Sequence, residues 1–153
     1  MAPRMDLWYI ANRARETLPE HLQASNMVQL AHTDGENKAL LPFYPACEFD
    51  IAESACPHPM TLCSLKEIRQ GLGKKIAVWG GIPSIALMES TMDDALFETY
   101  LDQLFEDMET GQGMILGVSD AVPPDAKLSR FEKIRSRIDA FGPVGSGRRR
   151  TER

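Results

Sequence analysis

Four short apolar segments alternate with longer amphipathic ones, and this alternation constrains the fold more than any other feature of the chain. The apolar segments cover residues 27–31, 49–54, 76–79 and 114–118. Short apolar runs of this kind are typical of strands buried on both faces of a parallel sheet. The sequence therefore predicts an α/β protein in which a helix precedes four β/α units with right-handed crossovers. Such units form either an open doubly wound sheet or part of a barrel.

Two helices are predicted in the first third of the chain. Residues 5–22 carry an apolar stripe at helical spacing, which predicts a first helix. Residues 36–46 are predicted to be helical as well, but they contain Pro42 and Pro45. Proline lacks an amide proton and clashes with the preceding turn, so the end of this helix must be kinked or irregular.

Three further helices have clearer signals at their ends. Ser64 and Glu67 have the spacing of a capping box, which predicts a short helix that ends at Gln70. The next helix lies between residues 91 and 111, and the last covers residues 128–141. The apolar side chains of this last helix are predicted to face inward; they are Leu128, Phe131, Ile134, Ile138 and Phe141.

The composition indicates one globular domain. The chain has 153 residues, of which 43% are hydrophobic and 25% are charged, and its formal net charge is -5. We therefore expect a folded domain over residues 1–141, and the negative charge argues against a nucleic-acid-binding protein. Residues 142–153 are rich in glycine and arginine and are predicted to form a disordered basic tail.

Cysteine usage and hydropathy indicate a soluble, cytoplasmic protein. The three cysteines form no Cys-x-x-Cys pair, so the sequence predicts neither a disulfide framework nor a four-thiolate zinc site. The N-terminal residues lack the long apolar core of a signal peptide. No segment approaches the roughly 20 apolar residues of a membrane span. We expect reduced thiols and no association with membranes.

Residues of functional type follow three of the predicted strands. His32 and Asp34 follow the first strand, Glu53 closes the second, and Ser119 and Asp120 follow the fourth. In (β/α) barrels the carboxyl ends of the strands carry the active site on one face. The sequence therefore predicts that these side chains share one rim.

Each of these residues also has a purely structural explanation. Asp34 and Asp120 are common turn or capping types, and a single histidine can serve as a hydrogen-bond donor alone. The adjacent Gly80 and Gly81 follow the third strand, where they allow either close approach of a ligand or a tight turn.

Glu53 and two residues that follow it in the chain have further possible explanations. Glu53 would be costly to bury alone, so it needs a metal, a substrate or a basic side chain as a partner. Cys56 and His58 belong to the loop after the second strand, and we expect both to be surface residues.

Four motifs in this order resemble the C-terminal half of the uroporphyrinogen decarboxylase superfamily. They are His-x-Asp-Gly-x-x-Lys, Asp-Ile-Ala-Glu before a Pro-x-Pro loop, Trp-Gly-Gly-Ile-Pro-Ser, and Ile-Leu-Gly-Val-Ser-Asp-x-Val-Pro-Pro. The resemblance covers nearly the whole chain outside the tail. It implies half of an eight-stranded TIM (β/α) barrel, with Glu53 as a catalytic residue and with substrate contacts at Gly80, Gly81 and Ser119.

The resemblance favours one branch of that superfamily over the other. True uroporphyrinogen decarboxylases of porphyrin biosynthesis need no metal and usually carry Gly-Asn-x-Asp-Pro and Gly-His-Gly-Ile in the third and fourth motifs. This chain lacks the Asn and the Asp of the third motif, and Asp120 stands at the position of the His. It is closer to the zinc-dependent methyltransferases that act on a corrinoid and a thiol.

In those methyltransferases one histidine and two cysteines bind the zinc. The matching positions here are His32, Asp34 and Asp120, so carboxylates replace both thiolates. Imidazole and carboxylate ligands suit zinc, and the harder set also suits iron or manganese. The resemblance thus implies a divalent metal at these three residues and a small molecule or a corrinoid protein as substrate.

Two alternatives to this enzyme half stay open. One is a true uroporphyrinogen decarboxylase, and the other is a catalytically silent half-barrel that serves as a binding partner. Four strands do not close a barrel, and an open parallel sheet leaves strand edges and an apolar face exposed. The chain is therefore expected to be a fragment that pairs either with a missing N-terminal half-barrel or with a second copy of itself.

Overall fold

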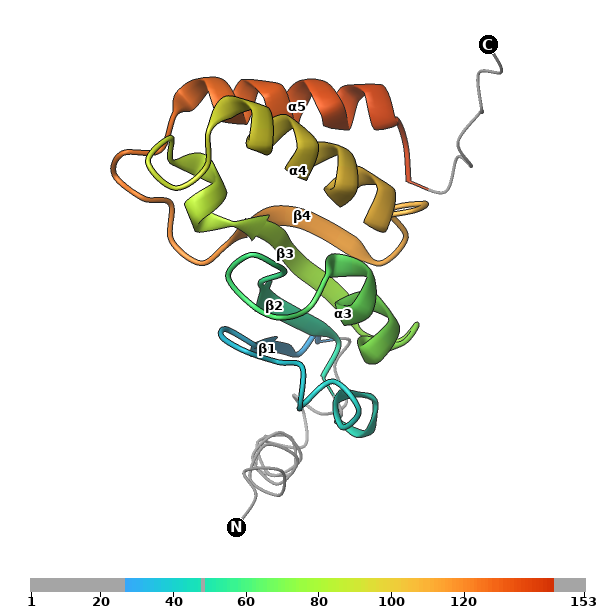
Figure 1. Ribbon diagram of the computed structural model, residues 1–153. Coiled ribbons are helices and arrows are strands. Elements are labelled where there is room, and N and C mark those ends of the chain that lie inside the picture. The colour runs from blue at the N-terminus through green and yellow to red at the C-terminus, as the bar shows by residue number, and fades with distance from the viewer. Residues whose placement is uncertain (1–26, 48, 145–153) are drawn as a thin grey trace.

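A computed structural model describes residues 27–47 and 49–144 and contains a parallel sheet of four strands (Figure 1). The strands lie in the order β1-β2-β3-β4; they are β1 (Leu30–His32), β2 (Ile51–Ala55), β3 (Ala77–Pro83) and β4 (Met114–Ser119). The helices are α3 (Leu65–Leu72), α4 (Asp94–Asp107) and α5 (Leu128–Phe141), with short 3-10 helices at η1 (Tyr44–Ala46) and η2 (Ser84–Leu87). The predicted α/β class with four parallel strands is confirmed. The predicted helix over residues 5–22 and residues 145–153 of the predicted tail lie outside the described residues.

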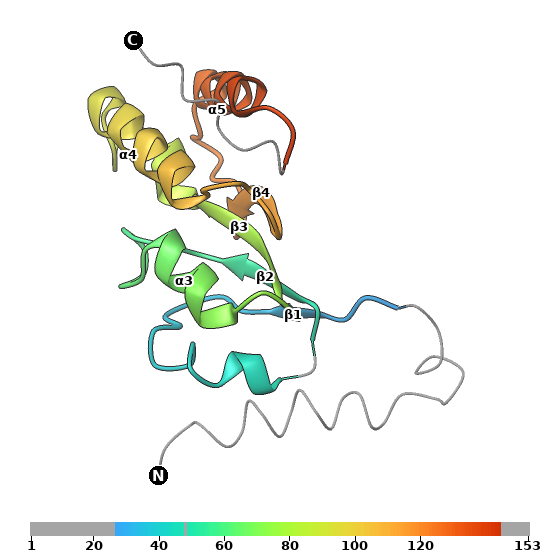
Figure 2. The same cartoon turned by 90° about the vertical axis from the view of Figure 1, so that its right-hand side faces the viewer.

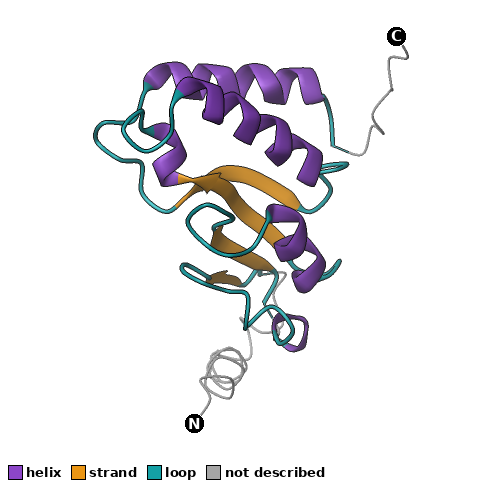
Figure 3. Ribbon diagram, viewed as in Figure 1, coloured by secondary structure: helices purple, strands orange, loops and turns teal. Residues whose placement is uncertain are grey.

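The helices lie on one side of the sheet. α3 and α4 flank the strands on the same side, and α5 lies beside α4 near the β4 edge (Figures 1, 2 and 3). Within residues 27–47 and 49–144, no helix covers the other face, which we call the open face. Among the described residues, the sheet therefore has one face packed by helices and one face that no helix covers.

Register and alternation divide the side chains between the two faces. Successive side chains of a strand point to opposite faces, and the paired residues Ala52 and Val78 are fully buried under the helices. The next row runs from His32 through Glu53 and Trp79 to Ile115, one residue from each strand. This second row lies on the open face, where Trp79 is 41% and Ile115 44% exposed.

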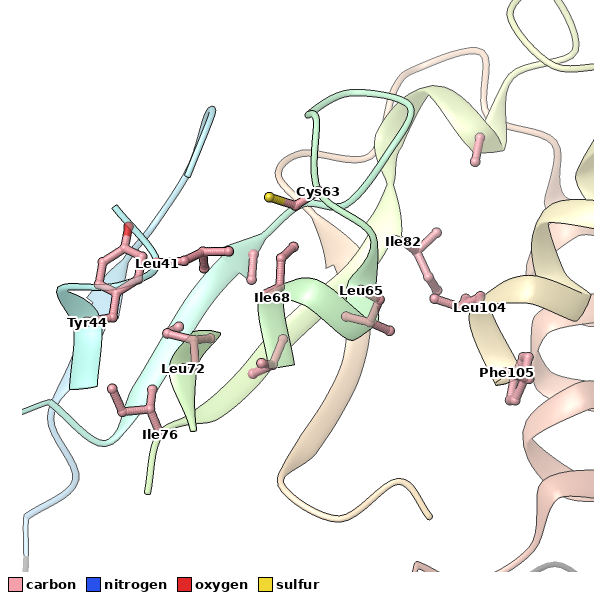
Figure 4. Packing of buried hydrophobic residues seen from close by; sticks show 14 of the residues in the cluster. Leu41, Tyr44, Cys63, Leu65, Ile68, Leu72, Ile76, Ile82, Leu104 and Phe105 are labelled. Atoms are coloured by element: carbon pink, nitrogen blue, oxygen red, sulfur yellow. The ribbon is translucent and has the colours of Figure 1, made fainter. Parts of the chain in front are cut away.

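The covered face is a continuous apolar core. α3 contributes Leu65, Ile68 and Leu72, which pack over the strands beside Leu41 and Tyr44 (Figure 4). α4 contributes residues with almost no exposed surface; they are Phe97, Leu101, Leu104 and Phe105. This burial explains why the helices stay on this face.

The helix ends agree closely with their sequence signals. The capping box is present, since Ser64 accepts the amide of Glu67 and the Glu67 carboxylate accepts the amide of Ser64. Asp93 caps α4 by accepting the amide of Leu96 at 2.8 Å. The predicted bounds of α5 are confirmed, and Gly142 follows it with a φ of 79°. α3 continues two residues beyond the predicted Gln70, through Gly71.

The predicted helix over residues 36–46 is wrong. This segment forms turns and then the 3-10 helix η1. Besides the two prolines, the amide group of Asn37 donates to the carbonyls of Thr33 and Gly35, and Tyr44 donates to Asn37. These bonds fold the segment back on itself in place of a helical ladder.

Other boundaries differ in smaller ways. The first strand begins at Leu30, and the preceding Met27 and Val28 are exposed and not part of a buried strand. β3 extends past residue 79 to Pro83, so the two glycines lie inside the strand. Leu128 and Ile138 of α5 are exposed, contrary to their predicted inward positions. None of the described helices is long and apolar enough to cross a membrane.

Candidate functional site

The central feature of the open face is a hydrogen-bonded pair of His32 and Glu53. His32 ends β1 and Glu53 lies directly opposite in β2, so the strand register brings the two side chains together. Nδ1 of His32 lies 2.5 Å from Oε2 of Glu53. The His32 side chain is 63% exposed and that of Glu53 27%, so both remain accessible. This pair joins two residues that the sequence assigned to separate roles.

Its electrostatics favour the charged imidazole. The hydrogen bond that His32 donates to the Glu53 carboxylate raises the pKa of His32 above its ordinary value of 6.5. Desolvation opposes this rise, and the negative charges of Glu53, Asp34 and Asp120 add to it. His32 therefore holds a proton nearer to neutral pH than a free histidine does. A group of this kind is suited to proton transfer.

Thr33 fixes the main chain of Glu53. Its amide and its hydroxyl both donate to the Glu53 carbonyl, each at 2.8 Å. Thr33 is itself buried, although its neighbour His32 is exposed. The pair is thus held through the backbone on one side and through the side chains on the other.

A bulge follows Glu53 in β2. The register shifts between Glu53 and Ala55, and the intervening Ser54 has a φ of 61°, in the left-handed region that non-glycine residues rarely adopt. The Ser54 hydroxyl is buried and has no hydrogen-bond partner in the structure. Strained backbone of this kind is often found next to functional sites.

Ser119 ties the carboxyl ends of three strands together. Its hydroxyl donates to the Ala55 carbonyl at 2.7 Å and accepts the amide of Gly81 at 2.9 Å. Ser119 is fully buried. A Cβ on Gly80 would lie 2.6 Å from the Ala55 carbonyl oxygen and 2.8 Å from the Ser119 hydroxyl, so only glycine fits there. These predicted substrate-binding residues are used in contacts within the protein.

The three predicted metal ligands do not form a preassembled site. Asp34 and Asp120 are exposed and close enough to His32 to raise its pKa, but Asp34 accepts the amide of Gly35 at 2.7 Å. In the part of the chain that the structure describes, no three His, Cys, Asp or Glu side chains converge in a geometry that could hold a metal ion. As these side chains are placed in the structure, they therefore do not form a three-ligand zinc site.

Cys56 directly follows β2 and is buried, so the prediction that it lies at the surface is wrong. His58 is exposed, as expected. Burial raises the pKa of Cys56 to about 11, against a smaller lowering by the Ser119 hydroxyl. At neutral pH this side chain is a neutral thiol. It cannot act as a ready thiolate nucleophile or metal ligand. All three cysteines are free, as predicted.

Sequence reasoning identified His32, Glu53 and Ser119 but missed how they are used. The carboxylate partner of His32 was not foreseen, and Thr33 was overlooked altogether. A signal was available, because residues at the ends of adjacent parallel strands meet when the strands pair in register. Trp79 was also visible as an aromatic residue inside a predicted strand, but its exposure depends on which face the helices cover.

No family model, curated protein or solved structure matches this chain.

Proposed function

We propose that the chain is the C-terminal half of a (β/α) barrel enzyme of the uroporphyrinogen decarboxylase superfamily, in which His32 is a general acid–base group oriented by Glu53. The observation that carries the proposal is the 2.5 Å contact between Nδ1 of His32 and Glu53 on an accessible face. A carboxylate on one ring nitrogen fixes the tautomer and leaves Nε2 to exchange a proton with a substrate.

The order of the strands and the placement of the helices support the proposal of a barrel. Doubly wound sheets reverse their strand order at a switch point and carry helices on both faces. Here the four strands pair in chain order and the helices lie on one face. This is the arrangement of a barrel wall, whose inner face carries the functional side chains near the strand ends.

In this proposal, the complete enzyme would also cover the open face. A barrel requires four more parallel strands, which would cover Trp79 and Ile115 and enclose the His32–Glu53 pair. An N-terminal half-barrel or a second copy of this chain would supply them. Enclosure would exclude water from the pair and strengthen its electrostatic effect on a small-molecule substrate.

A second candidate function is metal-dependent methyl transfer. The observation that favours it is again the contact at Nδ1, because histidines that bind metals usually donate their other nitrogen to a carboxylate. In this role His32 would be a ligand and Glu53 its support, with Asp34 or Asp120 moving to complete the set. Calorimetric titration with zinc, iron(II) and manganese(II) separates the two functions. Binding of one ion that disappears in His32→Ala favours the methyltransferase over the acid–base role.

The acid–base proposal is tested by nuclear magnetic resonance of the His32 ring in the full chain. We expect the neutral ring to hold its proton on Nδ1 and the pKa to lie above 6.5. In Glu53→Gln the carboxylate charge is lost, so the pKa should fall and the tautomer should shift toward Nε2. Substitution of the exposed Glu132→Gln on α5 is the control and should change neither value. Identical His32 signals in the wild type and in Glu53→Gln would contradict the pair.

A further inference from the structure

We infer that Thr33 and Ser119 are positioning residues that clamp the β2 bulge from both sides and so hold the Glu53 carboxylate at His32. The inference rests on the proposed role of the His32–Glu53 pair, but it concerns two residues outside the pair. It assigns Ser119 a different role from the substrate contact that the motif resemblance implies.

The first side of the clamp is Thr33. Both of its donors reach one atom, the Glu53 carbonyl oxygen, at 2.8 Å. The hydrogen bond from the Thr33 amide continues the ladder between the first two strands. The Thr33 hydroxyl adds a second hydrogen bond that a regular strand would lack. Because Thr33 directly follows His32, it locks the main chain of Glu53 to the same strand that carries the histidine.

The second side of the clamp is Ser119. It reaches the Ala55 carbonyl, two residues beyond Glu53, and also accepts the amide of Gly81. The Ser119 hydroxyl thus fixes the far end of the bulge to the third and fourth strands. Its complete burial leaves the hydroxyl no competing bond to solvent.

Between the two fixed points lies Ser54, whose positive φ would relax if either end were released. A relaxed bulge would restore regular alternation after Glu53 and change the direction of nearby side chains, since one residue of slip moves a side chain to the other face. The clamp therefore determines whether Glu53 stays opposite His32.

The experiment measures the His32 ring in Thr33→Val, Thr33→Ser and Ser119→Ala. Thr33→Val keeps the shape of the side chain and the hydrogen bond from the backbone amide but removes the hydroxyl. We therefore expect a partial fall of the His32 pKa and of the fraction of neutral rings that hold the proton on Nδ1. Thr33→Ser keeps the hydroxyl and should restore both values. Ser119→Ala should shift both further toward those of Glu53→Gln. Thr91→Val is the matched control, because Thr91 also donates to main-chain carbonyls, those of Ile85 and Met88, but far from the pair along the chain.

The outcomes separate this inference from the proposed function. If Glu53→Gln leaves the His32 signals unchanged, the pair itself is refuted. If Glu53→Gln shifts them but Thr33→Val and Ser119→Ala do not, the pair stands and the clamp is refuted. Should Ser119→Ala fail to fold, the comparison of Thr33→Val with Thr33→Ser still decides the matter, since a merely stabilising hydroxyl would change the unfolding midpoint without moving the ring signals.

Discussion

The two faces of the sheet use polar groups in opposite ways. On the covered side, the fully buried Arg130 of α5 donates to the carbonyls of Ala86, Met88 and Met92 and stacks over a phenylalanine ring. Its hydrogen-bonding groups serve to fix the loop after β3. On the open face, His32 and Glu53 satisfy each other and remain accessible. A polar group enclosed by the core supports structure, whereas a polar pair in register on an uncovered face is available for chemistry.

The two faces of the sheet should differ most in how much the truncation of an aliphatic side chain destabilises the protein. Leu101 of α4 has no exposed surface, so Leu101→Ala should lower the free energy of unfolding by about 2–5 kcal/mol through lost burial and a cavity. Ile115 lies half exposed on the open face, and Ile115→Ala should cost below about 1 kcal/mol. Urea unfolding of both variants measures the difference. A cost at Ile115 equal to that at Leu101 would mean that this face is covered in solution.

A smaller contrast is expected for two arginines of α5. Arg130→Met removes charge-assisted hydrogen bonds from buried carbonyls and should destabilise the protein by about 2–3 kcal/mol. Arg137 pairs with Glu98 and Asp102 near the surface, so Arg137→Met should cost below about 1 kcal/mol. The midpoints of thermal unfolding of the two variants, measured at one pH, test this difference. Equal midpoints for the two variants would remove the distinction between enclosed and accessible charges.

The smallest expected effect is a pH dependence of the His32–Glu53 pair. Because folding raises the pKa of His32, its stabilisation is fully present below the unfolded value of 6.5 and is lost as pH rises through the folded value. The difference in unfolding free energy between the wild type and His32→Gln should therefore be larger at about pH 5.5 than at about pH 9. Because the His32 ring is exposed to solvent, we expect this change with pH to stay below about 1 kcal/mol. A difference that grows with pH would contradict the pair.

Local signals in the sequence predicted much of the covered side. The last helix was predicted with its observed bounds, and the Ser64–Glu67 capping box was recognised from spacing alone. Such features depend on residues within one turn of each other, and nothing distant overrides them. The parallel sheet followed from the alternation of short apolar runs with helical periods.

The open face was harder to predict because its features depend on pairing between distant segments. Glu53 was expected to need a partner, but the choice of His32 depends on the register of two strands. Gly80 and Gly81 were predicted to follow the third strand, because the apolar run ends at Trp79, whereas pairing with the neighbouring strands continues β3 to Pro83. The segment after β1 forms turns and not the predicted helix, because the Asn37 side chain donates hydrogen bonds to the carbonyls of Thr33 and Gly35. The spacing of apolar residues does not reveal such bonds.

The sequential order of the strands has a consequence for how the chain acquires its structure. Each strand pairs only with its neighbours in the chain, so every β/α unit can dock as soon as the unit before it is in place. Assembly can then proceed in the direction of synthesis, with no late segment required to thread between earlier ones. By this route the strand that carries Glu53 meets the strand that carries His32 before the helices that bury the core have been made.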